Sequence, residues 1–351
     1  MTTRRENYLR AVRFERPEVI PVHFHVNEAC WHHYPQEALK ELLATHPMLF
    51  PDYEKPEGKV EPTYLPWQRA GEPFTDSWGC VWETTDDGIT GSVIRHPLET
   101  WDAFEGYTPP DPEHDFGWGS VDWRIEAERI RKQKADGRLA TGGLPHGHTF
   151  MRLMYIRGYE NLLYDMTDDD PRLARLIDTV ETLNLSVVRR YIAYGAELMG
   201  YPEDLGMQQG PMLSPEQFHR YIKPSYERLM APAREAGCIV HMHSDGDIRT
   251  LIDDLAESGV EVINLQDLVN GIDWIAGRLA GRICIDLDVD RQRITRFGTP
   301  AEVDALIREE VAKLGSREGG LMFTAGIYPG IPLDNIRALM DALEKYATYY
   351  S

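Results

Sequence analysis

The sequence predicts an α/β protein built as a single (β/α)8 TIM-type barrel with an N-terminal β-hairpin and loop elaboration. After residue 120, short apolar runs alternate with amphipathic helical segments, a pattern typical of a parallel sheet. The chain has 351 residues, enough for eight β/α units and one insertion. Neither a GxGxxG motif after the first strand nor a P-loop occurs, which argues against the alternative, an open doubly wound sheet.

The N-terminal part contains a helix, a strand and then the insertion. Residues 3–14 form a helix whose start carries a capping box, Thr3 with Glu6. The segment "VIPVHFHV" follows as the first strand. Residues 46–118 are rich in Pro, Trp and Gly and lack helical periodicity. Within them, residues 76–98 predict a β-hairpin with "DDG" as its turn. We expect residues 1–351 to form one domain with the insertion at about 46–118.

The remaining strands and helices alternate. The further strand candidates are "RLATGGL", "AELMGY", "CIVHMHS", "VEVINLQ", "RICIDLD" and "GGLMFTAG". Helices are predicted over residues 170–194, from Ser214, up to Gly259, from Thr299 and around residues 336–343. These strands and the first make seven, and the eighth strand of a barrel is expected within residues 46–118.

The composition excludes several classes of partner. With 37 basic and 57 acidic side chains, the net charge is -20, which disfavours binding to nucleic acid or anionic membranes. The four cysteines are widely spaced and form no CxxC pair, so neither disulfides nor a cysteine-rich zinc site is expected. No segment reads as a signal peptide or a membrane span. We expect a cytoplasmic protein, with a homodimer as one candidate assembly.

Polar side chains follow the predicted strands, where a β/α barrel places its active site. His243 and Asp245 lie on one face of an extended chain at the end of "CIVHMHS", and Glu203 follows "AELMGY". We predict these three as catalytic residues and metal ligands. A metal-free acid–base pair of His243 and Asp245 stays open. The predicted substrate-binding residues are His25, Asn27, His146, His148, Gln208, Asp288 and Tyr328. Core histidines and solvated loop charges are the structural alternatives for many of these positions.

Several segments, in this order and spacing, resemble the uroporphyrinogen decarboxylase superfamily, which includes corrinoid-dependent methyltransferases. They are "RENYLRAVRFERPEVIPV", "DSWGCVWE", "RGYENLLYDM", "PEDLGMQQGPMLSPEQFHRYIKPSYERL", "HMHSDGDIRTLIDDLAESGVEVINLQ", "FGTPAEV" and "GIPLDNIRAL". The resemblance runs through nearly the whole chain. It implies a (β/α)8-type barrel with an elaborated N-terminal region.

The resemblance favours the methyltransferases over the decarboxylase proper. The decarboxylase grips the substrate carboxylates with an Arg-rich N-terminal stretch, but "HFHVNEACWHHYP", residues 23–35, contains no Arg. The methyltransferases hold zinc with a His-x-Cys-Gly motif and a later Cys. Here "HSDG" places His243 on the His and Asp245 on the first Cys, and Ala325 stands at the second Cys. A carboxylate in place of the first thiolate implies a harder metal site, and the second strong ligand is lost at Ala325.

From these observations we predict a metal-assisted methyltransferase. It would demethylate a small O- or N-methylated substrate and pass the methyl group to a corrinoid protein. The expected cofactor is a divalent metal, zinc first, while cobalamin would be carried by the partner protein. A metal-independent decarboxylase or lyase of a small acid or porphyrinogen-like substrate is the first alternative. A non-catalytic binding protein on the same fold is the second.

Overall fold

A computed structural model describes residues 2–351, which divide into two compact units. Unit 1 contains the chain up to Ala70, the short stretch Thr84–Thr90 and the C-terminal part Asn264–Ser351. Unit 2 contains Gly71–Glu83 and Gly91–Ile263. Both units therefore draw on the region predicted as an insertion.

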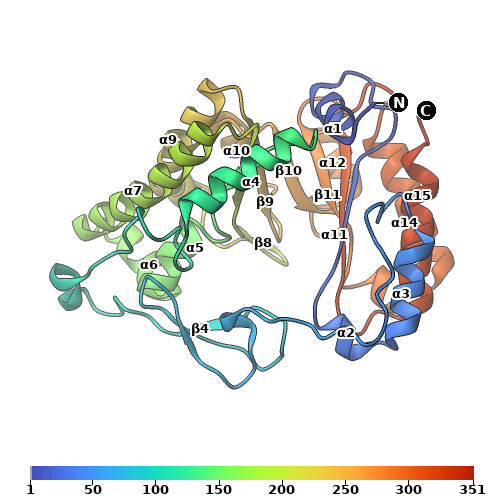
Figure 1. Cartoon of the computed structure of the whole chain (residues 1–351). Coiled ribbons are helices and arrows are strands. Elements are labelled where there is room, and N and C mark those ends of the chain that lie inside the picture. Colours follow the sequence, from blue (N-terminus) through green and yellow to red (C-terminus); the bar gives the residue numbers. More distant parts are fainter. Residues whose placement is uncertain (1) are drawn as a thin grey trace. The chain divides into compact units, whose positions relative to one another are not determined.

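Unit 1 carries parallel strands with helices around them. Strand β12 lies between β1 and β11, and both pairings are parallel, with Val22 opposite Phe323 and Ile285 opposite Leu321. Helices α14 and α15 pack against each other (Figure 1). The elements are α1 (Arg4–Arg13), β1 (Val22–Val26), α2 (Cys30–His33), α3 (Gln36–Thr45), the 3-10 helix η1 (Pro66–Gln68), α11 (Asp267–Asn270), α12 (Ile272–Arg278), β11 (Cys284–Asp288), α13 (Ile294–Phe297), α14 (Pro300–Leu314), β12 (Leu321–Ile327) and α15 (Leu333–Ala347).

Unit 2 repeats this parallel arrangement. Strand β6 lies between β5 and β9, and both pairings are parallel. Helices α7 and α9 pack side by side (Figure 1). The elements are β2 (Phe74–Thr75), β3 (Val81–Glu83), β4 (Ser92–Arg95), the 3-10 helix η2 (Trp101–Gly106), α4 (Trp123–Ala135), β5 (Thr141–Gly143), α5 (Phe150–Arg157), α6 (Tyr159–Thr167), α7 (Pro171–Tyr194), β6 (Leu198–Pro202), β7 (Gly206–Met207), β8 (Gly210–Pro211), α8 (Pro215–Gln217), the π-helix η3 (Phe218–Ile222), α9 (Lys223–Glu235), β9 (Ile239–Ser244) and α10 (Ile252–Ser258).

The main sheet has seven strands in the order β1-β12-β11-β10-β9-β6-β5, where β10 is Val262–Gln266. The predicted hairpin is confirmed, because β3 and β4 pair antiparallel. The expected eighth strand is not found in residues 46–118, all of which are described. The strands there, β2, β3 and β4, form a separate sheet of three. Trp82 of β3 is buried, and so is Trp78 in the turn before it.

Local sequence signals explain several helix starts. The Thr3 side chain accepts a hydrogen bond from the Glu6 N–H at the start of α1. Ser214 accepts from the Gln217 N–H ahead of α8, and Thr299 with Glu302 forms a complete capping box on α14. Each cap satisfies backbone N–H groups that have no partner inside the helix.

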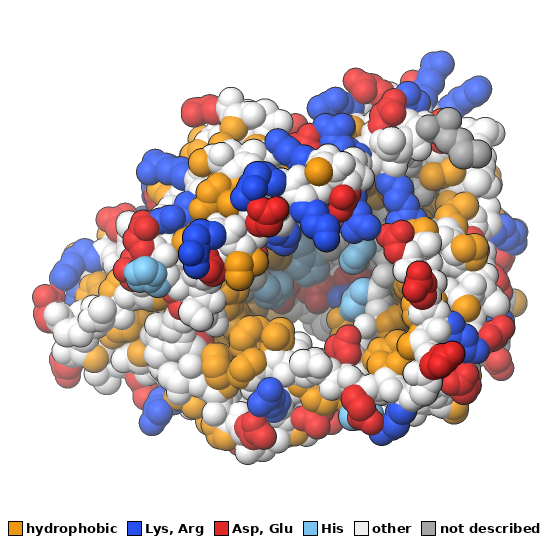
Figure 2. Space-filling model, in the orientation of Figure 1, with side chains coloured by type: hydrophobic (Ala, Val, Ile, Leu, Met, Phe, Trp, Pro, Cys, Tyr) orange, Lys and Arg blue, Asp and Glu red, His pale blue; other side chains and the backbone are white. Residues whose placement is uncertain are grey.

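The face in Figure 2 carries acidic and basic side chains interspersed with hydrophobic ones, although the net charge is -20. Among residues 2–351, no helix has both the length and the apolar character needed to cross a membrane. All four cysteines are buried free thiols.

Candidate active site

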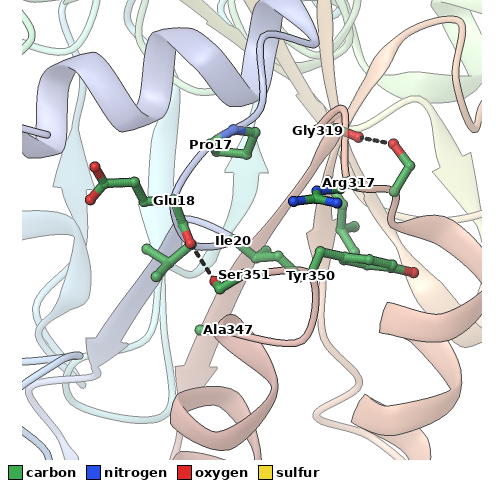
Figure 3. Close-up of a pocket in the computed structure, with 11 residues that line it drawn as sticks. Pro17, Glu18, Ile20, Arg317, Gly319, Ala347, Tyr350 and Ser351 are labelled. Carbon is green, nitrogen blue, oxygen red and sulfur yellow. Dashed lines mark hydrogen bonds between the residues drawn. The ribbon is translucent and has the colours of Figure 1, made fainter.

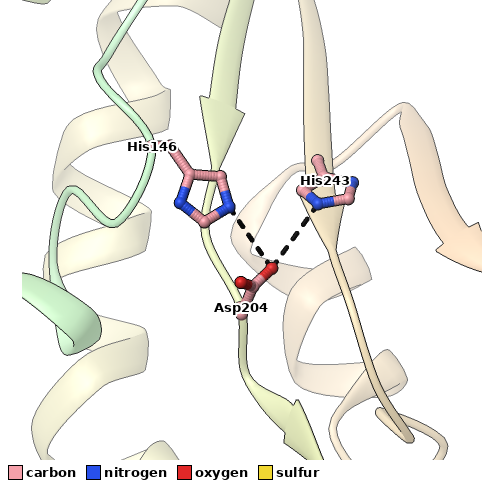
Figure 4. Close-up of side chains that lie close together, drawn as sticks. All are labelled: His146, Asp204 and His243. Atoms are coloured by element: carbon pink, nitrogen blue, oxygen red, sulfur yellow. Dashed lines mark ion pairs between the residues drawn. The ribbon is translucent and has the colours of Figure 1, made fainter. Parts of the chain in front are cut away.

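Three polar side chains in unit 2 converge just beyond the carboxyl ends of parallel strands. His146 follows β5, Asp204 follows β6, and His243 lies near the end of β9. Figure 4 shows both imidazole rings directed at the same Asp204 carboxylate. This is the end of the strands at which β/α barrels carry their active sites.

The three side chains have the spacing of a metal-ligand set. Their ligand atoms all lie within 4.8 Å of one another. The Asp204 Oδ1 atom is 3.3 Å from His146 Nε2 and 3.5 Å from His243 Nε2. The His146 side chain is 44% exposed, whereas Asp204 and His243 are 24% and 21% exposed. The cluster is therefore partly enclosed and remains accessible to a ligand.

Strand pairing and a close backbone contact fix these positions. In the parallel pairing of β6 and β9, Pro202 lies opposite His243. Beyond the strands, the two loops touch at Gly206 and Gly246. A Cβ atom on Gly246 would lie 2.1 Å from the Gly206 carbonyl carbon, and Gly246 has a positive φ of 82°. Only glycine fits both this close approach and the positive φ. Glycine at this position therefore allows the loops that follow Asp204 and His243 to lie in contact.

The surroundings of Asp204 favour its charged form. Burial by itself would raise the pKa of Asp204, but hydrogen bonds and charge from His146 and His243 outweigh it. The pKa of Asp204 is therefore lowered. The Asp245 backbone N–H also donates to Asp204 Oδ1 at 3.1 Å. An ionised carboxylate held between two imidazoles is a suitable donor set for a divalent metal.

Two predicted metal ligands lie outside this cluster. The Asp245 side chain approaches His243, with Oδ1 3.7 Å from Nε2, and is 36% exposed. Glu203 is fully buried. The Thr149 and Met151 N–H groups each donate to Glu203 Oε1 at 2.8 Å, and the Tyr226 hydroxyl donates to Oε2. Both Glu203 oxygens thus accept hydrogen bonds from protein donors, whereas Asp204 lies between the two histidines.

His148 and Gln208, both predicted to bind substrate, lie in different surroundings. His148 is buried, its ring packs against Tyr201 and Tyr226, and its Nδ1 atom is 2.6 Å from Thr149 Oγ1. Burial lowers the pKa of His148, so its ring is neutral and part of the packed interior. Gln208 is exposed in the turn between β7 and β8.

The other predicted substrate-binding residues belong to unit 1. Asp288 holds Arg291 through two hydrogen bonds of 2.9 and 2.8 Å. The Arg291 guanidinium lies over the Tyr328 ring at 5.6 Å, and the His25 ring meets Tyr328 edge-on. His25, Asp288 and Tyr328 therefore belong to one cluster at the carboxyl ends of β1, β11 and β12.

The Asn27 side chain forms hydrogen bonds with the backbone of two loops. Its side chain accepts a hydrogen bond from the Ala29 N–H at 2.9 Å and donates to the Gly88 carbonyl at 3.1 Å. It therefore joins two loops of unit 1, and both ends of its amide are occupied by backbone groups.

A pocket in unit 1 lies near the amino ends of β1 and β12 (Figure 3). It is a shallow depression lined by loop and C-terminal residues such as Glu18, Ile20, Arg317 and Tyr350. The Ser351 hydroxyl donates to the Glu18 carbonyl across it. Because barrel active sites form at the carboxyl ends of strands, this pocket is not a candidate active site.

Sequence reasoning placed His146 among the substrate-binding residues and chose Glu203 over Asp204. The available signal was the alternation of side chains along the strand. Tyr201 and Glu203 share one face, and Tyr201 donates to the Leu229 carbonyl of α9. Asp204 falls on the opposite face with Pro202, which pairs with His243. Extending the alternation beyond the strand would have favoured Asp204.

Comparison with known proteins gives consistent results. The family model for uroporphyrinogen decarboxylase (URO-D) matches residues 77–346. A uroporphyrinogen decarboxylase from Thermus thermophilus is 30% identical over 273 residues, 73% of this chain and 72% of the relative. One from Syntrophotalea carbinolica is 21% identical over 262 residues, 72% of each chain.

A solved methyltransferase from Methanosarcina mazei matches with a TM-score of 0.67 and 17% sequence identity over the full length of both chains. At this identity the likeness concerns the fold, and it confirms the predicted α/β barrel fold. The family model covers most of the sequence, and the alignment with the Thermus relative covers nearly three quarters of this chain. The chain belongs to the uroporphyrinogen decarboxylase family.

Proposed function

We propose that this protein is a metal-assisted methyltransferase. It removes a methyl group from a small O- or N-methylated substrate and passes it to a corrinoid carried by a partner protein. The observation that carries the proposal is the cluster of His146, Asp204 and His243. The proposed place of action is the cytoplasm, where buried thiols stay reduced.

The residues fit a divalent metal. Two imidazoles and one carboxylate form the type of set that holds zinc in catalytic sites, where a fourth position stays open for water or substrate. The same set also suits non-haem iron, and zinc is the ion proposed first. Asp204 supplies the negative charge and the histidines supply neutral nitrogen donors. We propose this set in place of His243, Asp245 and Glu203.

Demethylation requires that the leaving oxygen or nitrogen be stabilised as the bond to carbon breaks. When a methyl ether is demethylated, the carbon–oxygen bond breaks, the oxygen keeps both electrons, and the acceptor supplies the electron pair of the new bond to carbon. A metal at this site would supply Lewis acidity for the leaving oxygen or nitrogen. The leaving atom also takes up a proton. Asp245 is the ionisable side chain beside His243 that we propose for holding this proton.

Decarboxylation of a small acid is the second candidate, favoured by the names of the sequence relatives. Residues 23–35 contain no Arg, so a substrate with the many carboxylates of a porphyrinogen lacks the cationic partners expected there. The two candidates differ in their need for a metal and in the product formed.

Metal analysis of the purified protein, followed by activity assays, tests the proposal. We expect one equivalent of zinc per chain, lost in His146→Ala, Asp204→Asn and His243→Ala. His219→Ala is the matched control, because His219 pairs with Asp254 on the surface at 2.9 Å. Methyl transfer from methyl ethers or methylamines to a corrinoid protein should follow the metal content. Metal-free protein that releases carbon dioxide from a small acid would contradict the proposal.

A further inference from the structure

We infer that Glu203 is a positioning residue that fixes the chain segments carrying the three proposed metal ligands, through hydrogen bonds to the segments of His146 and His243 and through the peptide bond to Asp204. The inference rests on the proposed metal site and adds a residue that does not touch the metal. Glu203 directly follows β6 and is fully buried.

The side chain of Glu203 fixes the segment that carries His146. That segment runs from the end of β5 into the start of α5, where the Thr149 and Met151 N–H groups donate to Glu203 Oε1, each at 2.8 Å. A carboxylate is favourable at the start of a helix, where N–H groups lack partners inside the helix. In the same segment, the Gly147 N–H donates to the Pro202 carbonyl at 2.9 Å.

The backbone of Glu203 fixes the other two ligands. Its N–H group donates to the His243 carbonyl at 3.0 Å, and Asp204 is the next residue in the chain. One residue therefore links the three segments that carry the ligands. The Tyr226 hydroxyl of α9 donates to Glu203 Oε2, which anchors the carboxylate from the helix side.

Without the Glu203 side chain, the segment that carries His146 should lose its hydrogen-bonded anchor. The three proposed metal ligands themselves are unchanged in this variant. Two backbone N–H groups and the Tyr226 hydroxyl would lose their acceptor. Groups that orient metal ligands typically change metal affinity about 10- to 100-fold when mutated. We expect a weakening of zinc binding in this range for Glu203→Ala. Glu203→Gln keeps an oxygen for both N–H groups, so its affinity should stay near that of the wild type.

The test uses zinc affinity and the absorption spectrum of the cobalt-substituted protein. Zinc affinity is measured by competition with a chromophoric chelator, on protein whose fold is checked by circular dichroism. The cobalt spectrum reports ligand geometry independently of activity. Glu181→Ala is the matched control, because Glu181 is another buried glutamate of unit 2 and bonds Ser225 and Arg228 at 2.6 Å, outside the cluster.

The expected result is weaker zinc binding and an altered cobalt spectrum in Glu203→Ala, with both properties near wild type in Glu203→Gln and Glu181→Ala. Glu203→Asp, which keeps the charge on a shorter side chain, should also bind zinc more weakly and serves if the alanine variant does not fold. Unchanged zinc binding in all Glu203 variants overturns the positioning role and leaves the metal site standing. A wild-type protein that binds neither zinc nor cobalt overturns both.

Discussion

Replacing Glu310 with glutamine should stabilise the protein at neutral pH and change its stability little near pH 4. Glu310 lies on α14 and is fully buried. Within residues 2–351, neither of its carboxyl oxygens meets a hydrogen-bond donor. Burial, followed by the facing carboxylates of Asp267 and Asp290 and by Glu309, raises the pKa of Glu310 well above its ordinary value.

The proton belongs on Glu310 rather than on its neighbour. Asp267 accepts hydrogen bonds from the Leu268 N–H at 2.5 Å and the Asp290 N–H at 2.9 Å, which stabilise its charged form. Burial raises the pKa of Asp267 as well, and a close pair of this kind titrates jointly. A protonated Glu310 that donates to Asp267 satisfies both groups.

The magnitude follows from proton linkage. Above about pH 4.3, the ordinary pKa of glutamic acid, the unfolded chain releases the proton that folded Glu310 retains. The free energy of unfolding then falls by up to about 1.4 kcal/mol per pH unit until the folded group also ionises. Between pH 5 and pH 7 this amounts to up to about 2.7 kcal/mol. Glutamine keeps the size and a donor and has no proton to lose.

Urea denaturation of wild type and Glu310→Gln at pH 5, 6, 7 and 8 measures this effect, since groups that titrate independently of Glu310 cancel in the difference. The stability advantage of the variant should grow with pH. A difference for Glu310→Gln that does not vary with pH would refute a buried protonated carboxyl group.

Two further substitutions test an ion pair and a close backbone contact in unit 2. Asp76→Asn breaks the buried ion pair with Arg152, whose N–O distance is 2.7 Å, and should cost about 3–5 kcal/mol of unfolding free energy, measured by urea denaturation. Gly246→Ala places a Cβ 2.1 Å from Gly206 and should weaken zinc binding in a chelator competition. Gly237→Ala, also at positive φ but with open space around the Cβ, should leave zinc affinity unchanged.

The regular elements could be predicted because their signals are local. The buried run "CIVHMHS" corresponds to β9 and "RICIDLD" to β11, since a short apolar run between helical segments is typical of a buried parallel strand. The hairpin of β3 and β4 is also predictable, from its turn. The eighth strand was expected from the symmetry of the fold class, and no local signal in residues 46–118 supported it.

The site was only partly predictable because its geometry depends on contacts between distant segments. His243 was recognised from its motif, and it does lie in the cluster. Whether Glu203 or Asp204 faces His243 depends on the pairing of β6 with β9, which the sequence does not state. The partners that occupy Glu203, Thr149 and Tyr226, lie 54 and 23 residues away, so its burial could not be anticipated.

Anomalous diffraction from a crystal grown with zinc is the sharpest test of the proposed metal site, because it locates the ion without reference to a substrate. We expect one strong peak at the zinc edge, bounded by His146 Nε2, Asp204 Oδ1 and His243 Nε2, the atoms joined in Figure 4. The peak should vanish in Asp204→Asn crystals grown in the same way. A crystal grown with zinc that has no peak between these three residues, or that binds the ion elsewhere, would contradict the proposed metal site.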